Sequence, residues 1–195
     1  MTTRTLRYSS MIIALTGFMG CGKSSVGREL STLLGIPVVD LDKYIEQKAG
    51  KRIPDIFAES GESGFRKLET FCLSEVLFAQ TNLPSSSCSE DGTVSEDTSP
   101  EQSFILSLGG GTIVRPENVE MIRERCRVFF LRATVETLRL HLGGEQSQRP
   151  LLRSGGFEAL LQERAPLYAA AADYIIDTDN LSPMQIAGII ANLVT

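Results

Sequence analysis

Residues 17–24 read GFMGCGKS. They match the pattern G-x-x-x-x-G-K-S, in which backbone N–H groups bind the phosphates of a nucleoside triphosphate. An apolar run over residues 11–15 precedes the loop, and a helical pattern over residues 26–34 follows it. The loop therefore lies where its mechanism requires, between a buried strand and a helix N-terminus whose partial positive charge attracts anions.

The residues of this phosphate-binding loop have distinct expected contacts. Lys23 can reach the β- and γ-phosphates, and the Ser24 hydroxyl can bind Mg²⁺. A glycine-rich turn that binds nothing is the alternative, and the strand and helix beside the loop argue against it. The loop by itself leaves open a kinase, a GTPase or a motor. The predicted nucleotide site comprises Gly20, Cys21, Gly22, Lys23, Ser24 and Ser25.

Length, composition and charge describe one soluble domain. The chain has 195 residues, of which 42% are hydrophobic, and a net charge of −5. This length most simply forms a single domain over residues 1–195. Because no basic stripe is present to neutralise phosphates, a nucleic-acid binder is disfavoured. No apolar run approaches the ~20 residues of a membrane span, so we expect a cytoplasmic protein without a membrane partner, and a monomer.

Short apolar runs alternate along the chain with stretches of helical periodicity. Apolar residues recur at helical spacing over residues 26–34, 64–77 and 135–142. Because helices separate the apolar runs, the runs are predicted to form a parallel sheet covered on both faces, a three-layer α/β fold. The predicted strands are residues 11–15, 37–39, 104–108, 128–131 and 174–176.

A last helix is predicted near the C-terminus. Ser182 and Pro183 are typical of an N-cap followed by the first helical residue. The predicted apolar face of this helix comprises Met184, Ile186, Ile189, Ile190, Leu193 and Val194.

Two polar segments interrupt the alternation. Residues 81–103 are rich in Ser, Thr, Glu and Asp, so they bury too little apolar surface to offset the entropy of ordering. We predict a flexible insertion there, with a docking or phosphorylation segment as the alternative. Residues 143–156 contain Arg149 and Arg153 between two glycine pairs. That composition favours a mobile lid that closes over a triphosphate.

Two carboxylates follow the second predicted strand. Asp40 and Asp42 lie at its carboxyl end, which faces the ligand crevice in an open α/β sheet. Period-two alternation in an extended segment would direct both side chains to one side. One carboxylate could lie near Mg²⁺ while the other accepts a proton from an attacking hydroxyl. The alternative is that Asp42 only caps a helix over residues 43–49.

Further candidates for an acceptor site lie far apart in the sequence. Gly109, Gly110 and Gly111 follow the predicted central strand and would let the backbone approach a ligand closely. A simple tight turn is the alternative. Arg66 lies at the opening of a predicted helix, and Arg164 precedes Ala-Pro-Leu-Tyr. Two arginines could clamp a carboxylate through bidentate hydrogen bonds, although most arginines are merely solvated.

In their order and spacing, these motifs resemble those of the shikimate kinase family. The resemblance implies a P-loop fold like that of nucleoside-monophosphate kinases, with a five-stranded parallel sheet in the order 2-3-1-4-5. It also implies transfer of the ATP γ-phosphoryl group to the 3-hydroxyl of shikimate, a step in aromatic amino-acid and chorismate biosynthesis. The motifs that carry it are residues 17–24, 40–42, 55–57, 61–69, 107–111, 149–152 and 164–168.

The resemblance also implies a role for each candidate residue. Asp42 would hold the shikimate hydroxyls and act as the base, while Lys23 holds the phosphates. Arg149 would move in with the lid to bind ATP and stabilise the transferring phosphoryl group. Mg²⁺, the implied cofactor, would be held by Ser24 and, through a water, by Asp40. Shikimate would be bound by Asp42, Arg66, Arg164 and the backbone of Gly109, Gly110 and Gly111.

The sequence departs from the family pattern at one position, and two other functions stay open at this point. Family members often carry an arginine before the lid that packs on adenine, and here Arg139 or His141 takes that place. For His141, the only histidine, an exposed helix position is the alternative. Another small-molecule kinase of this fold is the second candidate, and a non-catalytic nucleotide-binding module is the third.

Overall fold

The computed structural model describes residues 11–78, 103–143 and 156–195. Its five strands form one parallel sheet in the order β2-β3-β1-β4-β5. This is the order that the family resemblance implied, so the predicted fold class is confirmed. The strands are β1 (Ile12–Thr16), β2 (Val38–Asp40), β3 (Phe104–Ser107), β4 (Cys126–Arg132) and β5 (Tyr174–Asp177).

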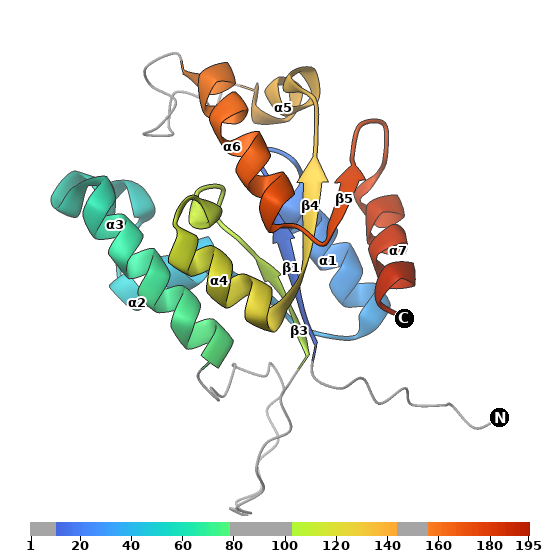
Figure 1. Cartoon of the computed structure of the whole chain (residues 1–195), viewed down its shortest axis with the longest axis horizontal. Coiled ribbons are helices and arrows are strands. Elements are labelled where there is room, and N and C mark those ends of the chain that lie inside the picture. The colour runs from blue at the N-terminus through green and yellow to red at the C-terminus, as the bar shows by residue number, and fades with distance from the viewer. Residues whose placement is uncertain (1–10, 79–102, 144–155) are drawn as a thin grey trace, which may run out of the picture.

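Helices cover both faces of the sheet. α1 (Lys23–Leu34) and α7 (Pro183–Val194) pack on each other, and α1 also contacts β1, β2 and β3. α4 (Pro116–Arg125) and α6 (Phe157–Ala171) contact β4, and α3 (Ile53–Phe78) packs on α4. In Figure 1, α4 and α6 lie in front of the sheet and α1 lies behind it. The sheet is therefore the middle one of three layers, as predicted.

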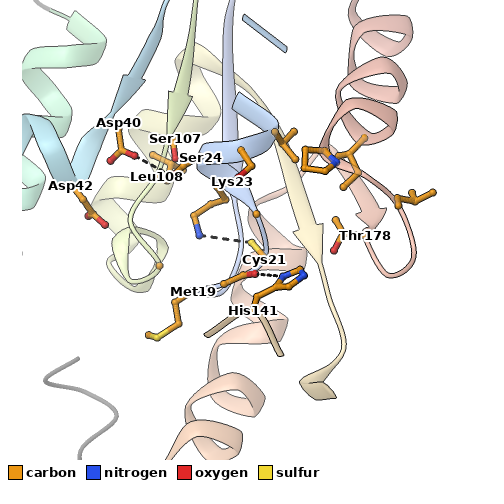
Figure 2. A pocket seen from close by; sticks show the side chains of 18 residues that line it. Met19, Cys21, Lys23, Ser24, Asp40, Asp42, Ser107, Leu108, His141 and Thr178 are labelled. Atoms are coloured by element: carbon orange, nitrogen blue, oxygen red, sulfur yellow. Dashed lines mark hydrogen bonds between the residues drawn. The ribbon is translucent and has the colours of Figure 1, made fainter. Parts of the chain in front are cut away.

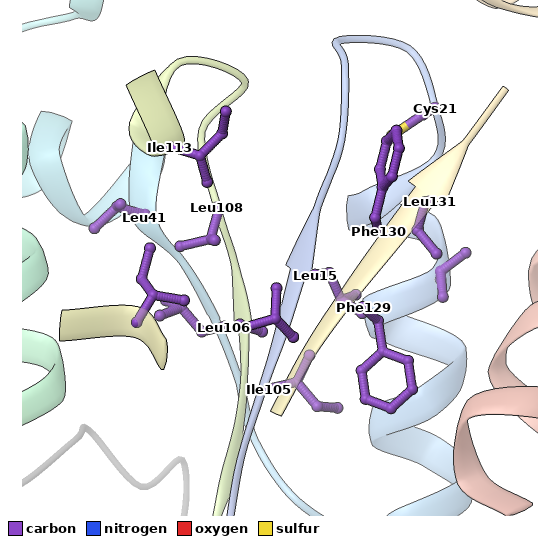
Figure 3. Close-up of a cluster of buried hydrophobic side chains, with 14 of the residues drawn as sticks. Leu15, Cys21, Leu41, Ile105, Leu106, Leu108, Ile113, Phe129, Phe130 and Leu131 are labelled. Atoms are coloured by element: carbon purple, nitrogen blue, oxygen red, sulfur yellow. The ribbon is translucent and has the colours of Figure 1, made fainter. Parts of the chain in front are cut away.

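The hydrophobic core is built on the three middle strands. Leu15 of β1, Leu106 of β3 and Phe129 of β4 are fully buried, and Figure 3 shows them in one cluster. Parallel strands covered on both faces are apolar throughout rather than alternating, which explains the continuous apolar runs in the sequence. This packed block fixes the positions of the loops that leave the strands.

Those loops meet at the carboxyl edge of the sheet. The phosphate-binding loop joins β1 to α1, and α2 (Leu41–Ala49) follows β2 directly. The glycine loop and a 3₁₀ turn, η1 (Thr112–Val114), follow β3, and α5 (Val135–Leu142) follows β4. In open α/β sheets this edge is the usual place for ligands.

Several helices differ from their predicted extents. α1 begins at Lys23 rather than at residue 26, and the helix predicted over residues 64–77 belongs to α3. Within α3, Gly61 leaves the helical conformation (φ 66°, ψ −177°), so Arg66 still lies near the start of a helical segment. α4 and α6 were not predicted. α4 has few apolar residues to show periodicity, and Pro166 lies inside α6.

The last helix confirms its predicted start and corrects its predicted face. Ser182 caps α7, and Gln185 completes a reciprocal capping box. Ile186, Ala187 and Ile190 are buried on the inward face, and Val194 is partly buried against the core. Met184, Ile189 and Leu193 are exposed instead, because α1 covers only a narrow stripe of this almost wholly apolar helix.

Some sequence predictions fall on residues outside the described ranges. They are the predicted insertion, except Ser103, and the predicted lid, except Gly143 and Gly156. Arg149 belongs to this lid and also lies outside the described ranges. The structure therefore does not test them. In the described part of the chain, no helix is long and apolar enough to cross a membrane.

Candidate active site

The phosphate-binding loop has the backbone shape that its sequence predicts. Gly22 takes a left-handed conformation (φ 93°, ψ 11°) and is the N-cap of α1. Residues other than glycine rarely adopt such a φ. The carbonyl of Gly22 accepts the first bonds of the helix, from Ser25 N at 3.1 Å and Val26 N at 2.9 Å. The N-terminus of a twelve-residue helix thus opens directly from the loop.

The ammonium of Lys23 lies within this loop. Its Nζ donates to the carbonyl oxygens of Gly17 (2.8 Å) and Phe18 (3.1 Å) and lies 3.8 Å from the Sγ of Cys21. Cys21 is buried, with 3% exposure. The loop carbonyls therefore hold the positive charge beside the backbone that is expected to bind phosphate.

Two oxygens suited to Mg²⁺ lie next to the loop. Ser24 Oγ donates to Asp40 Oδ2 at 3.3 Å, which brings a hydroxyl and a carboxylate together at one wall of a cavity. Mg²⁺ prefers oxygen ligands, of which proteins commonly supply one or two while phosphates and waters supply the rest. Among the described residues, no group of three or more His, Cys, Asp or Glu is placed so that it could hold a metal ion. The residues therefore fit a Mg²⁺ shared with phosphate.

A cavity of about 520 Å³ runs along the loop. At one end it is lined by Asp40, Asp42 and Ser107, and at the other by Thr178, Leu181 and Pro183. Figure 2 shows Lys23 between the two aspartates and Thr178. The cavity thus has an acidic end and a more apolar end, with the phosphate-binding loop between them.

The two aspartates share the cavity for a reason other than the predicted one. The extended conformation ends at Asp40, because α2 begins at Leu41. Asp40, not Asp42, is the N-cap, and its Oδ1 accepts from Lys43 N at 3.3 Å. Asp42 lies in the first turn of α2 and still lines the cavity. The period-two argument and the capping alternative for Asp42 are therefore both wrong, although the predicted convergence is present.

The glycine loop after β3 is where the acceptor-site candidates converge. A Cβ atom at Gly109 would lie 2.6 Å from Asp42 Oδ1, and one at Gly111 would lie 2.3 Å from Arg66 Nη2. Either contact is too short for a real carbon atom, so both side chains occupy space that only glycine leaves open. The carbonyl of Gly110 accepts from Arg164 Nη1 at 3.2 Å. The loop is therefore more than a simple turn.

Arg66 is already paired, which the sequence interpretation did not include. Its Nη1 donates to Glu69 Oε2 at 2.7 Å, and its Nη2 donates to Glu62 Oε1 at 3.3 Å. Glu69 is buried, with a side chain 1% exposed, whereas the Glu62 side chain is 54% exposed. The (i, i+3) spacing of Glu69 from Arg66 could have indicated this pair. Only the structure shows that it is buried.

Arg164 is buried with its charge directed at the glycine loop. It is 4% exposed, and within the described ranges its Nε has no hydrogen-bond partner. Tyr168, one turn later on α6, donates its hydroxyl to the same Gly110 carbonyl. Burial raises the pKa of Tyr168 above its usual value, so the hydroxyl keeps its proton and remains a donor. Burying a charge without full hydrogen bonding is costly, which favours an anionic partner for this guanidinium beside the glycine loop.

Arg139 and His141 have different surroundings in the structure. Both lie on α5, but His141 lines the cavity, and its Nδ1 lies 2.9 Å from the carbonyl of Gly20. Since a carbonyl can only accept, Nδ1 carries the proton in this contact. Arg139 pairs with Glu158 and lies over the ring of Phe157. His141 is exposed on its helix, as the alternative predicted, and it also contacts the phosphate-binding loop.

Comparisons with known proteins agree with this geometry. The family model of shikimate kinase matches residues 19–83 and 88–195. The chain belongs to the shikimate kinase family. It is 38% identical to the shikimate kinase of Dictyoglomus turgidum over 172 residues, which cover 86% of this chain and 88% of the relative. It is 36% identical to that of Pseudomonas syringae pv. tomato, with coverage of 93% and 95%.

Solved structures of shikimate kinases share the fold. The enzyme from Acinetobacter baumannii, solved in complex with shikimate, matches with a TM-score of 0.79 and 33% identity, over 95% of this chain and 93% of that one. The shikimate kinase of Bacteroides thetaiotaomicron matches with a TM-score of 0.73 and 30% identity, over 94% and 96%. A Deinococcus radiodurans tunicamycin resistance protein, at 19% identity and a TM-score of 0.63, shares the fold alone.

Proposed function

We propose that this chain transfers the γ-phosphoryl group of ATP to the 3-hydroxyl of shikimate. The observation that supports this function best is the convergence on one glycine loop of a carboxylate, Asp42, and two buried guanidinium groups, Arg66 and Arg164. Shikimate is a small anionic polyol, so it requires a carboxylate for its hydroxyls and arginine for its carboxyl group. Membership of the shikimate kinase family supports the same substrate.

The proposed roles of the residues fall into two groups, one for each substrate. Lys23 and the backbone of the loop hold the ATP phosphates and reduce the charge repulsion between them and the incoming oxygen. Asp42 accepts the proton of the attacking hydroxyl, while Arg66 and Arg164 orient the acceptor through its carboxylate. Mg²⁺, held by Ser24 and through water by Asp40, would neutralise charge on the transferring phosphoryl group. For Arg149, we propose that it stabilises that charge and binds ATP.

His141 and the more apolar end of the cavity complete the proposed ATP site. Thr178, Leu181 and Pro183 line this end, opposite the aspartates, and His141 lies on α5 beside the loop. A flat nucleobase suits such a slot, because it buries apolar faces and leaves its polar edges to a few partners. We therefore assign the adenine contact to His141 rather than Arg139.

A coupled assay of ADP release tests the proposal directly. With ATP, Mg²⁺ and shikimate we expect turnover, and with gluconate or a nucleoside monophosphate in place of shikimate we expect none. Turnover on either of the other acceptors instead of shikimate would favour another kinase of this fold. ATP binding by calorimetry without turnover on any acceptor would favour a non-catalytic module.

Chelation tests the metal. Excess EDTA should abolish turnover, and added Mg²⁺ should restore it, because uncompensated phosphate charge opposes transfer. Activity that persists in EDTA would contradict the assignment of Ser24 and Asp40. The monomeric state and the cytoplasmic location stay predictions from the sequence.

A further inference from the structure

A hydrogen-bond network behind the glycine loop determines how Arg66 is presented. Glu69 uses its two carboxylate oxygens separately: Oε2 accepts from Arg66 Nη1 at 2.7 Å, and Oε1 accepts from the Thr112 hydroxyl at 2.9 Å. Thr112 is fully buried and 43 residues away from Glu69 in the sequence. An ionised carboxylate cannot donate, so the Thr112 hydroxyl must be the donor.

Thr112 is itself held in place from both sides of its backbone. Its N–H donates to the carbonyl of Gly109 at 3.2 Å, and its own carbonyl accepts from Asn118 Nδ2 at 2.9 Å. Asn118 is fully buried on α4. The hydroxyl is therefore a fixed donor at the end of the glycine loop rather than a freely rotating surface group.

The hydrogen bond from Thr112 affects how Glu69 can pair with Arg66. A carboxylate and a guanidinium prefer a bidentate arrangement, in which two oxygens accept from two nitrogens. In this structure Oε1 of Glu69 accepts from Thr112, and Glu69 bonds Arg66 through Oε2, which accepts from Nη1. Nη2 lies in the space that a Cβ on Gly111 would occupy, and it bonds Glu62, an exposed side chain, at 3.3 Å.

The contact with Glu62 shows that Nη2 can hold a second carboxylate. Exposed (i, i+4) ion pairs contribute little net free energy, so an incoming carboxylate can displace Glu62 at small cost. Glu69 cannot be displaced in the same way, because it is buried and bonded at both oxygens. The two partners of Arg66 are therefore one permanent carboxylate and one replaceable carboxylate.

We propose that Thr112 is a positioning residue that reserves Arg66 Nη2 for the carboxylate of the acceptor by restraining Glu69. This inference rests on the proposed function. Without the Thr112 hydroxyl, Oε1 of Glu69 lacks its donor in a buried site and turns toward Arg66 to recover one. Both guanidinium nitrogens then pair with Glu69, and the acceptor carboxylate loses a partner.

The test compares shikimate with its methyl ester in the purified full chain. Wild type should have a higher kcat/KM for shikimate than for its methyl ester, and this ratio is called the acid preference. In Thr112→Val, which keeps the side-chain shape, this preference should fall about tenfold, the effect of one charge-assisted hydrogen bond. The KM for shikimate should rise while the KM for ATP and kcat change little. Thr112→Ser, which retains the hydroxyl, should restore the preference.

A matched control removes a different hydroxyl from the same region. Thr70 donates its hydroxyl to the backbone carbonyl of Arg66 at 3.0 Å rather than to Glu69, so Thr70→Val should leave the acid preference unchanged. If Thr112→Val does not fold, Thr112→Ala, which adds no methyl group, takes its place. An unchanged acid preference in a folded Thr112 variant overturns the inference, as does an equal rise in both KM values. Absence of shikimate turnover in wild type instead overturns the proposed function.

Discussion

The donor side and the acceptor side of the candidate site are built in different ways. The donor side is the loop over residues 17–24, eight consecutive residues that act mainly through their backbone. The acceptor side collects side chains from α2, α3 and α6 around the glycine loop that follows β3. A motif of neighbouring residues forms once a single loop folds correctly. The acceptor side forms only when three helices pack in the correct positions relative to one another.

The difference shows in what glycine does on each side. In the phosphate-binding loop, Gly22 provides a backbone conformation, with φ at 93°. In the loop after β3, Gly109 and Gly111 provide empty space, which Asp42 and Arg66 occupy. The first use is local and can be recognised in the sequence. The second depends on side chains far away in the sequence, and it is visible only when they are in place.

The largest effect is expected on the acceptor side, at Asp42. Asp42→Asn keeps the shape of the side chain but removes the proton acceptor, so kcat should fall about 1,000-fold, within the range for general bases. The ADP-release assay measures kcat, and calorimetry should find ATP affinity unchanged. A kcat within tenfold of wild type would remove Asp42 from the role of base.

The next largest effect is expected on the donor side, at Lys23. Lys23→Met should lower kcat/KM at least about 100-fold, because a cation that offsets charge developing on the phosphates is lost. Shikimate binding, measured by calorimetry without nucleotide, should be retained, since the acceptor side uses other elements. Equal loss of shikimate affinity would show that the two sides are not independent.

A smaller effect is expected where glycine provides space. Gly111→Ala should raise the KM for shikimate about tenfold, because a methyl group 2.3 Å from Arg66 Nη2 displaces the guanidinium. The KM for ATP should stay the same. Gly188→Ala is the matched control, because a Cβ there meets no atom within 4 Å and lies in a helix. An unchanged shikimate KM in Gly111→Ala would contradict the role given to Arg66.

The smallest effect separates the two candidates for adenine. His141→Leu should raise the KM for ATP about threefold, the loss expected for one neutral hydrogen bond. Arg139→Leu should leave it unchanged, because Arg139 is engaged with Glu158 and Phe157. Steady-state kinetics with varied ATP decide between them. A raised KM for ATP in Arg139→Leu but not in His141→Leu would assign the adenine contact to Arg139 instead.

The fold was largely predictable, and its exceptions have physical causes. Strands buried on both faces appear as apolar runs, and the caps of the last helix follow from Ser182 and Pro183. The helix starts after β1 and β2 were placed too late, because α1 opens with polar residues and because Asp40, not Asp42, is the N-cap of α2. The predicted apolar face of the last helix wrongly included Met184 and Leu193, because hydropathy does not state which side of an apolar helix meets α1.

For the site, the sequence by itself determined the donor: the spacing of Gly17, Gly22, Lys23 and Ser24 dictates a local backbone shape, and a local shape needs no distant contact. It also supplied the residue types of the acceptor side, which the family resemblance connected. Only the tertiary structure decided that Asp40 is the cap, that Arg66 is paired with a buried Glu69, and that Thr112 bonds that carboxylate. Those facts depend on contacts between residues up to 43 positions apart, and packing of the whole chain sets such contacts.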